Sequence, residues 1–205
     1  MIIEQMSLFA PAGQSRGLPL DVLEYTAGFL AEEKSNMLLN DFIADVPWSQ
    51  KLVKMYDREV LTPRLTAWYG DRLGIDYGRL GKSMPLAWTP ELRWLKSLVE
   101  PIAGISFNSV LLNYYRDGKD SVAWHSDKET VMGSHPIIAS LSLGAVRSFD
   151  IRRKDDHNEK YSIRLEHGSL LIMKGDLQSK WEHRIAKSSL FLGPRINLTF
   201  RKISA

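Results

Sequence analysis

The second half of the chain alternates apolar and polar residues in short runs, which is the pattern of β-strands. Six runs from residue 106 onward are rich in β-branched and aromatic residues: SFNSVLLNYY, IIASLSL, RSFDIRR, KYSIRLE, GSLLIM and PRINLTFRK. Turn residues separate them, so the pattern predicts a sandwich, a jelly roll or a barrel of short strands.

Two earlier segments carry apolar residues at helical spacing instead. The first is residues 31–45. In the second, Thr89 suits an N-cap, Pro90 suits the first helical position, and residues 101–104 (PIAG) suit the end of the helix. We expect both helices to pack on one outer face of the strands. The expected fold class is therefore mainly β with flanking helices (α+β).

Two segments lack a clear periodicity. Residues 10–19 (APAGQSRGLP) are rich in Pro, Gly and small polar residues, which is typical of a flexible linker. We therefore expect a flexible tail over residues 1–19 and a single domain over residues 20–205. Residues 48–88 are rich in aromatic residues, Gly and Arg, and we expect a long irregular segment with a functional role there.

Composition narrows the chemistry of any metal site. The chain has no cysteine, which excludes disulfides, iron–sulfur clusters and thiolate zinc sites. Its net charge of +3 permits an anionic partner without requiring one. There is no apolar run of bilayer length and no basic, apolar secretory signal at the N-terminus, so we expect a cytoplasmic protein without membrane contact.

Five histidines are available as imidazole ligands, and one of them begins an H-x-D motif. We expect His125 and Asp127 at the start of a strand, where residues i and i+2 point to the same face. His183, late in the β region, supplies a second imidazole. Two histidines and a carboxylate form the facial triad of non-haem Fe(II) enzymes, but the same set could bind zinc and a catalytic water. An isolated H-x-D is more often a solvated loop, so further evidence is needed.

The last strand supplies that evidence. Read with period two, RINLTFR places four polar side chains on one face and three apolar ones on the other. The polar side chains are Arg195, Asn197, Thr199 and Arg201. Two arginines on one face repel each other and favour a bound anion, such as a dicarboxylate co-substrate. Asn113 and Tyr115 share a face of strand 107–115 and could add hydrogen bonds to the same anion.

Together these motifs resemble the AlkB family of Fe(II)- and 2-oxoglutarate-dependent dioxygenases, especially its DNA-repair members. The matching pieces are NYYRDGKD (113–120), HSD (125–127), His183 and RINLTFR (195–201). The resemblance covers residues 106–202, and residues 60–75 more loosely. It implies a double-stranded β-helix (jelly roll) core over residues 106–202, N-terminal helices, and a nucleotide-recognition lid over residues 48–88.

The resemblance also implies a role for each matched residue. His125, Asp127 and His183 would bind Fe(II), and Arg195 would pair with the distal carboxylate of 2-oxoglutarate. Other residues would contact or support this co-substrate: Asn113, Tyr115, Asn197, Thr199 and Arg201. With O₂, such a site would oxidatively demethylate N-alkylated bases (1-methyladenine, 3-methylcytosine) in nucleic acid. The resemblance favours DNA over RNA as the substrate. The alternatives are a dioxygenase acting on RNA or protein, and a nucleic-acid-binding module with a vestigial metal site.

A methylated base reaches such an iron only when it is flipped out of a duplex or already single-stranded. In the implied lid, Tyr56 and Tyr77 are the candidate contacts to that base. The tryptophans Trp48, Trp68 and Trp88 suit the protein core better than a base pocket. The YGRLGK stretch that begins at Tyr77 lacks the paired aromatic residues expected for base stacking.

Charged residues complete the implied substrate site. Glu129 occupies the position of an acidic residue that faces the target base in the family, and a carboxylate suits a cationic lesion. Its alternative role is a surface ion pair with Lys128. The basic cluster Arg152, Arg153 and Lys154 would contact phosphates.

The N-terminal tail contains a short motif of its own: Gln5, Met6, Ser7, Leu8 and Phe9. This QMSLF segment resembles the QLSLF pentapeptide with which bacterial DNA-maintenance proteins bind the sliding clamp. Leu8 and Phe9 would enter an apolar pocket of the clamp, or alternatively pack on the domain itself. If the source is bacterial, clamp binding would place the protein at the nucleoid.

Overall fold

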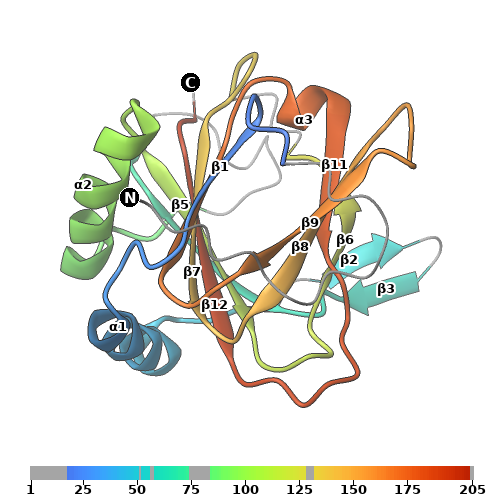
Figure 1. Cartoon of the computed structure of the whole chain (residues 1–205). Helices are drawn as coiled ribbons and strands as arrows, with labels where there is room; N and C mark the ends of the chain where they lie inside the picture. The colour runs from blue at the N-terminus through green and yellow to red at the C-terminus, as the bar shows by residue number, and fades with distance from the viewer. Residues whose placement is uncertain (1–17, 51, 56–57, 74–83, 128–131, 204–205) are drawn as a thin grey trace, which may run out of the picture.

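The computed structural model describes residues 18–50, 52–55, 58–73, 84–127 and 132–203, and within them two antiparallel sheets face each other (Figure 1). The major sheet has six strands in this order: β1 (Leu23–Thr26), β10 (Ser169–Met173), β7 (Ile138–Gly144), β12 (Arg195–Arg201), β5 (Ser109–Tyr115) and β4 (Leu65–Gly70). The minor sheet has four: β6 (Val122–His125), β11 (Trp181–Ile185), β8 (Arg147–Arg153) and β9 (Lys160–Leu165). All six runs predicted from alternation form strands.

Three helices accompany the sheets in the described part of the chain. The helices α1 (Glu32–Asp45) and α2 (Pro90–Ala103) lie together on the outer face of the major sheet, as predicted (Figure 1). Thr89 caps α2 by accepting a hydrogen bond from the Leu92 N–H at 3.3 Å. The helix continues through Pro101 and ends at Gly104, whose φ of 67° is the left-handed conformation that glycine tolerates. The short helix α3 (Leu177–Lys180) leads directly into β11.

The strand β12 separates two hydrophobic cores. Ile196, Leu198 and Phe200 pack in a cluster with the two long helices. A second cluster joins the major and minor sheets, with Leu171 from β10 and Ile151 from β8 among its members. Every residue of β12 is buried. The strands β5 and β7 pair along its two edges, and its faces are covered by the helices on one side and by the minor sheet on the other. The polar face predicted for this strand therefore lies inside the protein, between the sheets.

The segment 48–88 is more regular than predicted. It contains the hairpin formed by β2 (Leu52–Met55) and β3 (Arg58–Leu61), and β4 pairs with β5 along its whole length. Its tryptophans attach it to the body of the protein. The Trp48 ring packs on Tyr114 with centroids 5.2 Å apart, Trp68 Nε1 donates to Ser109 Oγ at 2.6 Å, and Trp88 is buried in the core cluster. These contacts support the core role expected for the tryptophans.

The described helices are all too short or too polar to cross a lipid bilayer.

Candidate functional site

The three predicted metal ligands converge at one edge of the minor sheet. His125 ends β6, Asp127 lies two residues beyond it, and His183 lies in β11 directly opposite His125 in the antiparallel register. The two imidazole centroids are 4.4 Å apart, and ligand atoms of all three residues lie within 4.8 Å of one another. The expectation that the H-x-D motif starts a strand was wrong, because the motif ends β6 and Asp127 lies outside the strand.

The surroundings hold these side chains in the forms that bind a metal. His125 Nδ1 lies 2.9 Å from the Ala123 carbonyl oxygen; a carbonyl only accepts hydrogen bonds, so Nδ1 donates there and Nε2 is the ring nitrogen left for a metal. Burial, reinforced by neighbouring charges, lowers the pKa of His183 to about 3 and keeps its imidazole neutral. The neutral imidazole of His183 and Nε2 of His125 are therefore both available to a metal.

Asp127 is held as a carboxylate by its neighbours. Burial alone would raise its pKa, but the charge of Arg201 and the hydrogen bond that its guanidinium donates bring that pKa below its usual range. Arg201 Nη2 donates to Asp127 Oδ2 at 2.9 Å, while Oδ1 lies 3.8 Å from His125 Nε2. One carboxylate oxygen is thus engaged by the guanidinium, and the other lies on the side of the imidazoles.

A cavity of about 190 Å³ opens beside this triad, between the two sheets. All of the residues predicted for the metal and the co-substrate line it: His125, Asp127, His183, Asn113, Tyr115, Arg195, Asn197, Thr199 and Arg201. Its apolar wall includes Phe149 and Ile185 of the minor sheet. The predicted polar face of the last strand and the H-x-D motif therefore form one site.

Arg195 is a buried cation that hydrogen-bonds to no carboxylate in the described part of the chain. The residue is 1% exposed, and its Nη2 donates to Ser142 Oγ at 3.0 Å. Its Nε and Nη1 have no hydrogen-bond partner among the described residues. Burial lowers the pKa of Arg195 to about 10. The charge of Arg147 lowers this pKa further, and Tyr115 raises it. An anion bound in the cavity would satisfy this guanidinium.

The remaining polar residues of β12 mostly support one another. Asn197 Nδ2 donates to Ser140 Oγ at 2.7 Å and to the Leu141 carbonyl at 3.1 Å. Thr199 Oγ1 donates to Asn197 Oδ1 at 2.9 Å. The carboxamide of Asn197 therefore has protein partners at both ends, which favours a supporting role over direct contact with a co-substrate.

Arg64 and Gln178 bond to predicted site residues but were not found from the sequence. Arg64, between β3 and β4, lines the cavity and donates from Nε to Asn113 Oδ1 at 2.8 Å. Gln178 of α3 accepts a hydrogen bond from the Asp127 N–H at 2.7 Å. The only sequence signal for Arg64 was its place in the loosely matched segment 60–75. Gln178 gave no signal.

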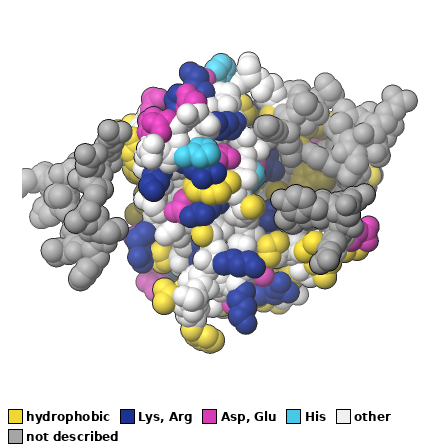
Figure 2. Space-filling model, turned by 90° about the vertical axis from the view of Figure 1, so that its right-hand side faces the viewer, with side chains coloured by type: hydrophobic (Ala, Val, Ile, Leu, Met, Phe, Trp, Pro, Cys, Tyr) yellow, Lys and Arg dark blue, Asp and Glu magenta, His cyan; other side chains and the backbone are white. Residues whose placement is uncertain are grey.

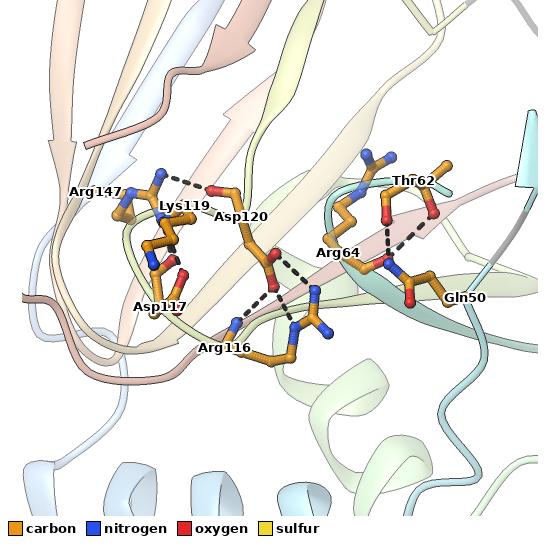
Figure 3. Close-up of polar contacts among 8 residues, drawn as sticks. All are labelled: Gln50, Thr62, Arg64, Arg116, Asp117, Lys119, Asp120 and Arg147. Carbon is orange, nitrogen blue, oxygen red and sulfur yellow. Dashed lines mark hydrogen bonds and ion pairs between the residues drawn. The ribbon is translucent and has the colours of Figure 1, made fainter. Parts of the chain in front are cut away.

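The turn between β5 and β6 explains another part of the matched motif (Figure 3). Asp120 accepts hydrogen bonds from the Arg116 side chain at 2.8 and 2.9 Å and from its backbone N–H at 2.9 Å. The buried Arg147 side chain donates to the carbonyls of Asp117 and Asp120. A Cβ added at Gly118 would lie 2.8 Å from the Leu190 carbonyl oxygen. These motif residues therefore shape the turn that leads to His125.

The basic cluster predicted to contact phosphates has partners within the protein. Arg152 Nε donates to Glu182 at 2.6 Å, and Arg153 Nη2 donates to Asp155 at 2.6 Å. Lys154 Nζ donates to two carbonyls of α3. In Figure 2, which views the side where β6 and β11 lie in Figure 1, cationic and anionic side chains are intermixed. Phosphate contact by this cluster remains a prediction.

Several predicted residues lie outside the described ranges. They are Tyr56, Tyr77, Glu129 and the tail residues Gln5, Met6, Ser7, Leu8 and Phe9. Their roles toward a base or a sliding clamp remain predictions.

Comparisons with known proteins agree with the site. Residues 22–201 match the family model described as the 2OG-Fe(II) oxygenase superfamily. The chain is 44% identical over 184 residues to Alpha-ketoglutarate-dependent dioxygenase alkB homolog 3 of Homo sapiens, covering 86% of this chain and 64% of that relative. It is 38% identical over 159 residues to DNA oxidative demethylase ALKBH2 of Homo sapiens, covering 74% and 60% of the two chains.

These relatives confirm the AlkB resemblance predicted from the motifs, although the chain spans less than two thirds of their length. A solved structure, that of OsALKBH1, superposes with a TM-score of 0.64 at 17% identity, covering 88% of this chain and 97% of that one. At 17% identity the match shows the fold alone, and it confirms the predicted jelly roll.

Proposed function

The chain belongs to the 2OG-Fe(II) oxygenase superfamily, and from this premise we propose that it is an Fe(II)- and 2-oxoglutarate-dependent dioxygenase that demethylates N-alkylated bases in DNA. One observation carries the proposal: the His125, Asp127 and His183 ligand atoms share one cavity with the buried guanidinium of Arg195. A hydrolytic zinc site would have no use for that cation.

The residues present fit both groups. Two imidazoles and a carboxylate on one side are the ligand set that leaves coordination positions of Fe(II) open. When bound, the iron with 2-oxoglutarate and O₂ would supply the oxidation of an N-methyl group, yielding formaldehyde, succinate, CO₂ and the unmodified base. The protein would bind the distal carboxylate of 2-oxoglutarate through Arg195 and orient Asp127 through Arg201. The facing sheets would exclude water from the reaction.

The proposed substrates are 1-methyladenine and 3-methylcytosine, which are cationic bases. The support is the printed name of one relative, DNA oxidative demethylase, together with the acidic residue Glu129 two positions after Asp127. Tyr56 and Tyr77 are proposed to contact the base, and Arg152 and Arg153 to contact phosphates. Each internal partner of the basic cluster would then compete with a phosphate.

Turnover of methylated oligonucleotides tests the proposal directly. With Fe(II), ascorbate and 2-oxoglutarate, we expect the protein to release formaldehyde and restore the base in single- or double-stranded DNA carrying 1-methyladenine or 3-methylcytosine. Reactions lacking 2-oxoglutarate are the control. Activity on methylated RNA or peptide alone would move the substrate to those classes, and no turnover on any of them would favour a binding module with a vestigial metal site.

The tail motif leads to a second, independent proposal about partners. We expect a peptide of residues 1–12 to bind a bacterial sliding clamp through Leu8 and Phe9, which would enter an apolar pocket, with Gln5 as a polar anchor. Fluorescence polarisation of the labelled peptide measures this. Binding should be lost on combined Leu8→Ala and Phe9→Ala substitution. Equal binding of this variant, or none by the native peptide, would contradict the proposal.

A further inference from the structure

The backbone of Asp127 is positioned by a side chain from another part of the fold. Asp127 lies beyond the last residue of β6, so the ladder between β6 and β11 does not extend to it. Its N–H donates instead to Gln178 Oε1 at 2.7 Å, across 51 residues of sequence. Gln178 is 8% exposed, so this hydrogen bond is sheltered from competing water.

The orientation of the Gln178 carboxamide is fixed at its other end. Gln178 Nε2 contacts Met173 Sδ at 3.9 Å, a weak donor contact to a residue that also lines the cavity. The amide nitrogen therefore faces the thioether, and the oxygen faces the Asp127 N–H. A side chain turned the other way would place two donors against each other.

Helix α3, which carries Gln178, is itself fastened to the end of β8. Lys154 Nζ donates to the Gln178 carbonyl at 2.7 Å and to the Ser179 carbonyl at 2.8 Å. The Lys154 N–H donates to the Lys180 carbonyl at 2.9 Å. The positive charge of an ammonium group also interacts favourably with the negative, C-terminal end of the helix dipole.

Two metal ligands depend on this arrangement. Helix α3 runs directly into β11, and His183 is the third residue of that strand. The same helix thus leads along the chain to His183 and reaches Asp127 through Gln178. Arg201 Nη2 holds the Asp127 carboxylate by a hydrogen bond of 2.9 Å.

We propose that Gln178 is a positioning residue for the metal centre, which sets the Asp127 backbone while Lys154 holds α3 in place. This inference rests on the proposed metal site. It also gives Lys154 a role different from the phosphate contact expected from the sequence. Residues that orient metal ligands typically change metal affinity by about 10- to 100-fold when replaced.

The first test compares variants of the full chain by Mn(II) titration in an isothermal calorimeter. Gln178→Met keeps the length of the side chain but has no oxygen acceptor, and we expect about 10-fold weaker Mn(II) binding. Gln178→Glu keeps an oxygen acceptor and is expected to restore most of that affinity. Ser179→Ala, on the same helix, removes a hydroxyl that donates only to the Asp176 carbonyl in the described residues, and should bind like the native protein.

A second readout reports the hydrogen bond without the metal. In the metal-free protein, the Asp127 amide should exchange with solvent deuterium faster in Gln178→Met than in Ser179→Ala, at matched melting temperatures. If Gln178→Met binds Mn(II) as tightly as the native chain, or Gln178→Glu rescues nothing, the inference is wrong. If the native chain binds no Mn(II), the proposed function fails as well, so the two failures are distinguishable.

Lys154→Met separates the positioning role from phosphate contact. We expect weaker Mn(II) binding in the same direction as Gln178→Met, because α3 loses its attachment to β8. The salt dependence of nucleic-acid binding should stay unchanged, whereas loss of a phosphate contact would reduce the slope by about one unit per charge. A reduced slope with native Mn(II) affinity would overturn this assignment.

Discussion

Replacement of Asp127 by alanine is expected to reduce turnover of a methylated oligonucleotide below detection. The variant removes the only anionic ligand of the triad and leaves two imidazoles to bind a divalent cation. It also takes away the carboxylate at 2.9 Å from the Arg201 guanidinium, whose side chain is 10% exposed. The positive charge of Arg201 would then oppose metal binding at short range.

Formaldehyde release and Mn(II) titration measure the two parts of this effect. We expect the Asp127→Ala protein to stay folded, as judged by circular dichroism, while both signals are lost. Asp156→Ala is a matched control, because Asp156 lies at an exposed turn where its Oδ1 accepts from the Asn158 N–H. Turnover by folded Asp127→Ala at the rate of the Asp156→Ala control would show that the triad does not carry the reaction.

The strand β12 shows why much of the core was predictable. Its polar and apolar residues alternate strictly, and both faces are buried, one against the helices and one in the cavity. Such a pattern identifies a strand and a polar site together. The metal site was predictable for another reason. A chain with no cysteine and five histidines offers few possible metal centres.

The elements that escaped prediction lack such patterns. Strand β6 has four residues that are all partly or fully exposed, and its pairing with β11 shifts register between His183 and Ile185. Strand β4 buries neighbouring residues in pairs instead of alternating. Neither gives a period-two signal, so the H-x-D motif was assigned to the wrong end of a strand and segment 48–88 was expected to be irregular.

Hydrogen bonds between residues distant in the sequence were also not predicted. Arg64 bonds Asn113 across 49 residues, and Gln178 bonds Asp127 across 51. No local pattern encodes these pairs, because they depend on how the strands are ordered in the two sheets. The resemblance to the AlkB family assigned roles to matched residues only, and both Arg64 and Gln178 lie outside the motifs that carried it.

Substitution of Arg195 by methionine is expected to raise the KM for 2-oxoglutarate about 100-fold, since hydrogen bonds to a charged group contribute about 1.5–3 kcal/mol. The guanidinium has two unsatisfied nitrogens in the cavity, and methionine offers no donor to a carboxylate. Metal binding should change little, because Arg195 makes no hydrogen bond to the triad among the described contacts. The substitution should therefore weaken the binding of 2-oxoglutarate and leave the affinity for Mn(II) unchanged.

The same substitution should stabilise the protein when no co-substrate is present. A buried guanidinium without a carboxylate is a net cost to folding, and a similarly long apolar side chain removes that cost. Burial lowers the pKa of Arg195 to about 10 in the folded protein, below its usual range. Below pH 10 the Arg195 guanidinium is charged, and its burial lowers the free energy of unfolding by the full amount. Above pH 10 the folded chain releases the proton before the unfolded chain does, so this contribution to stability rises with pH, by up to about 1.4 kcal/mol per unit.

Thermal unfolding of the native and Arg195→Met proteins checks both expectations. At pH 8 without co-substrate, we expect the variant to melt at a higher temperature, and the difference to shrink as the pH approaches 10.5. With Mn(II) present in every sample, adding 2-oxoglutarate should raise the melting temperature of the native chain and leave that of the variant unchanged. Arg164→Met, on an exposed position of β9, controls for the exchange of side chain. A variant that still responds to 2-oxoglutarate would remove Arg195 from the co-substrate site, and with it the observation on which the proposed function depends.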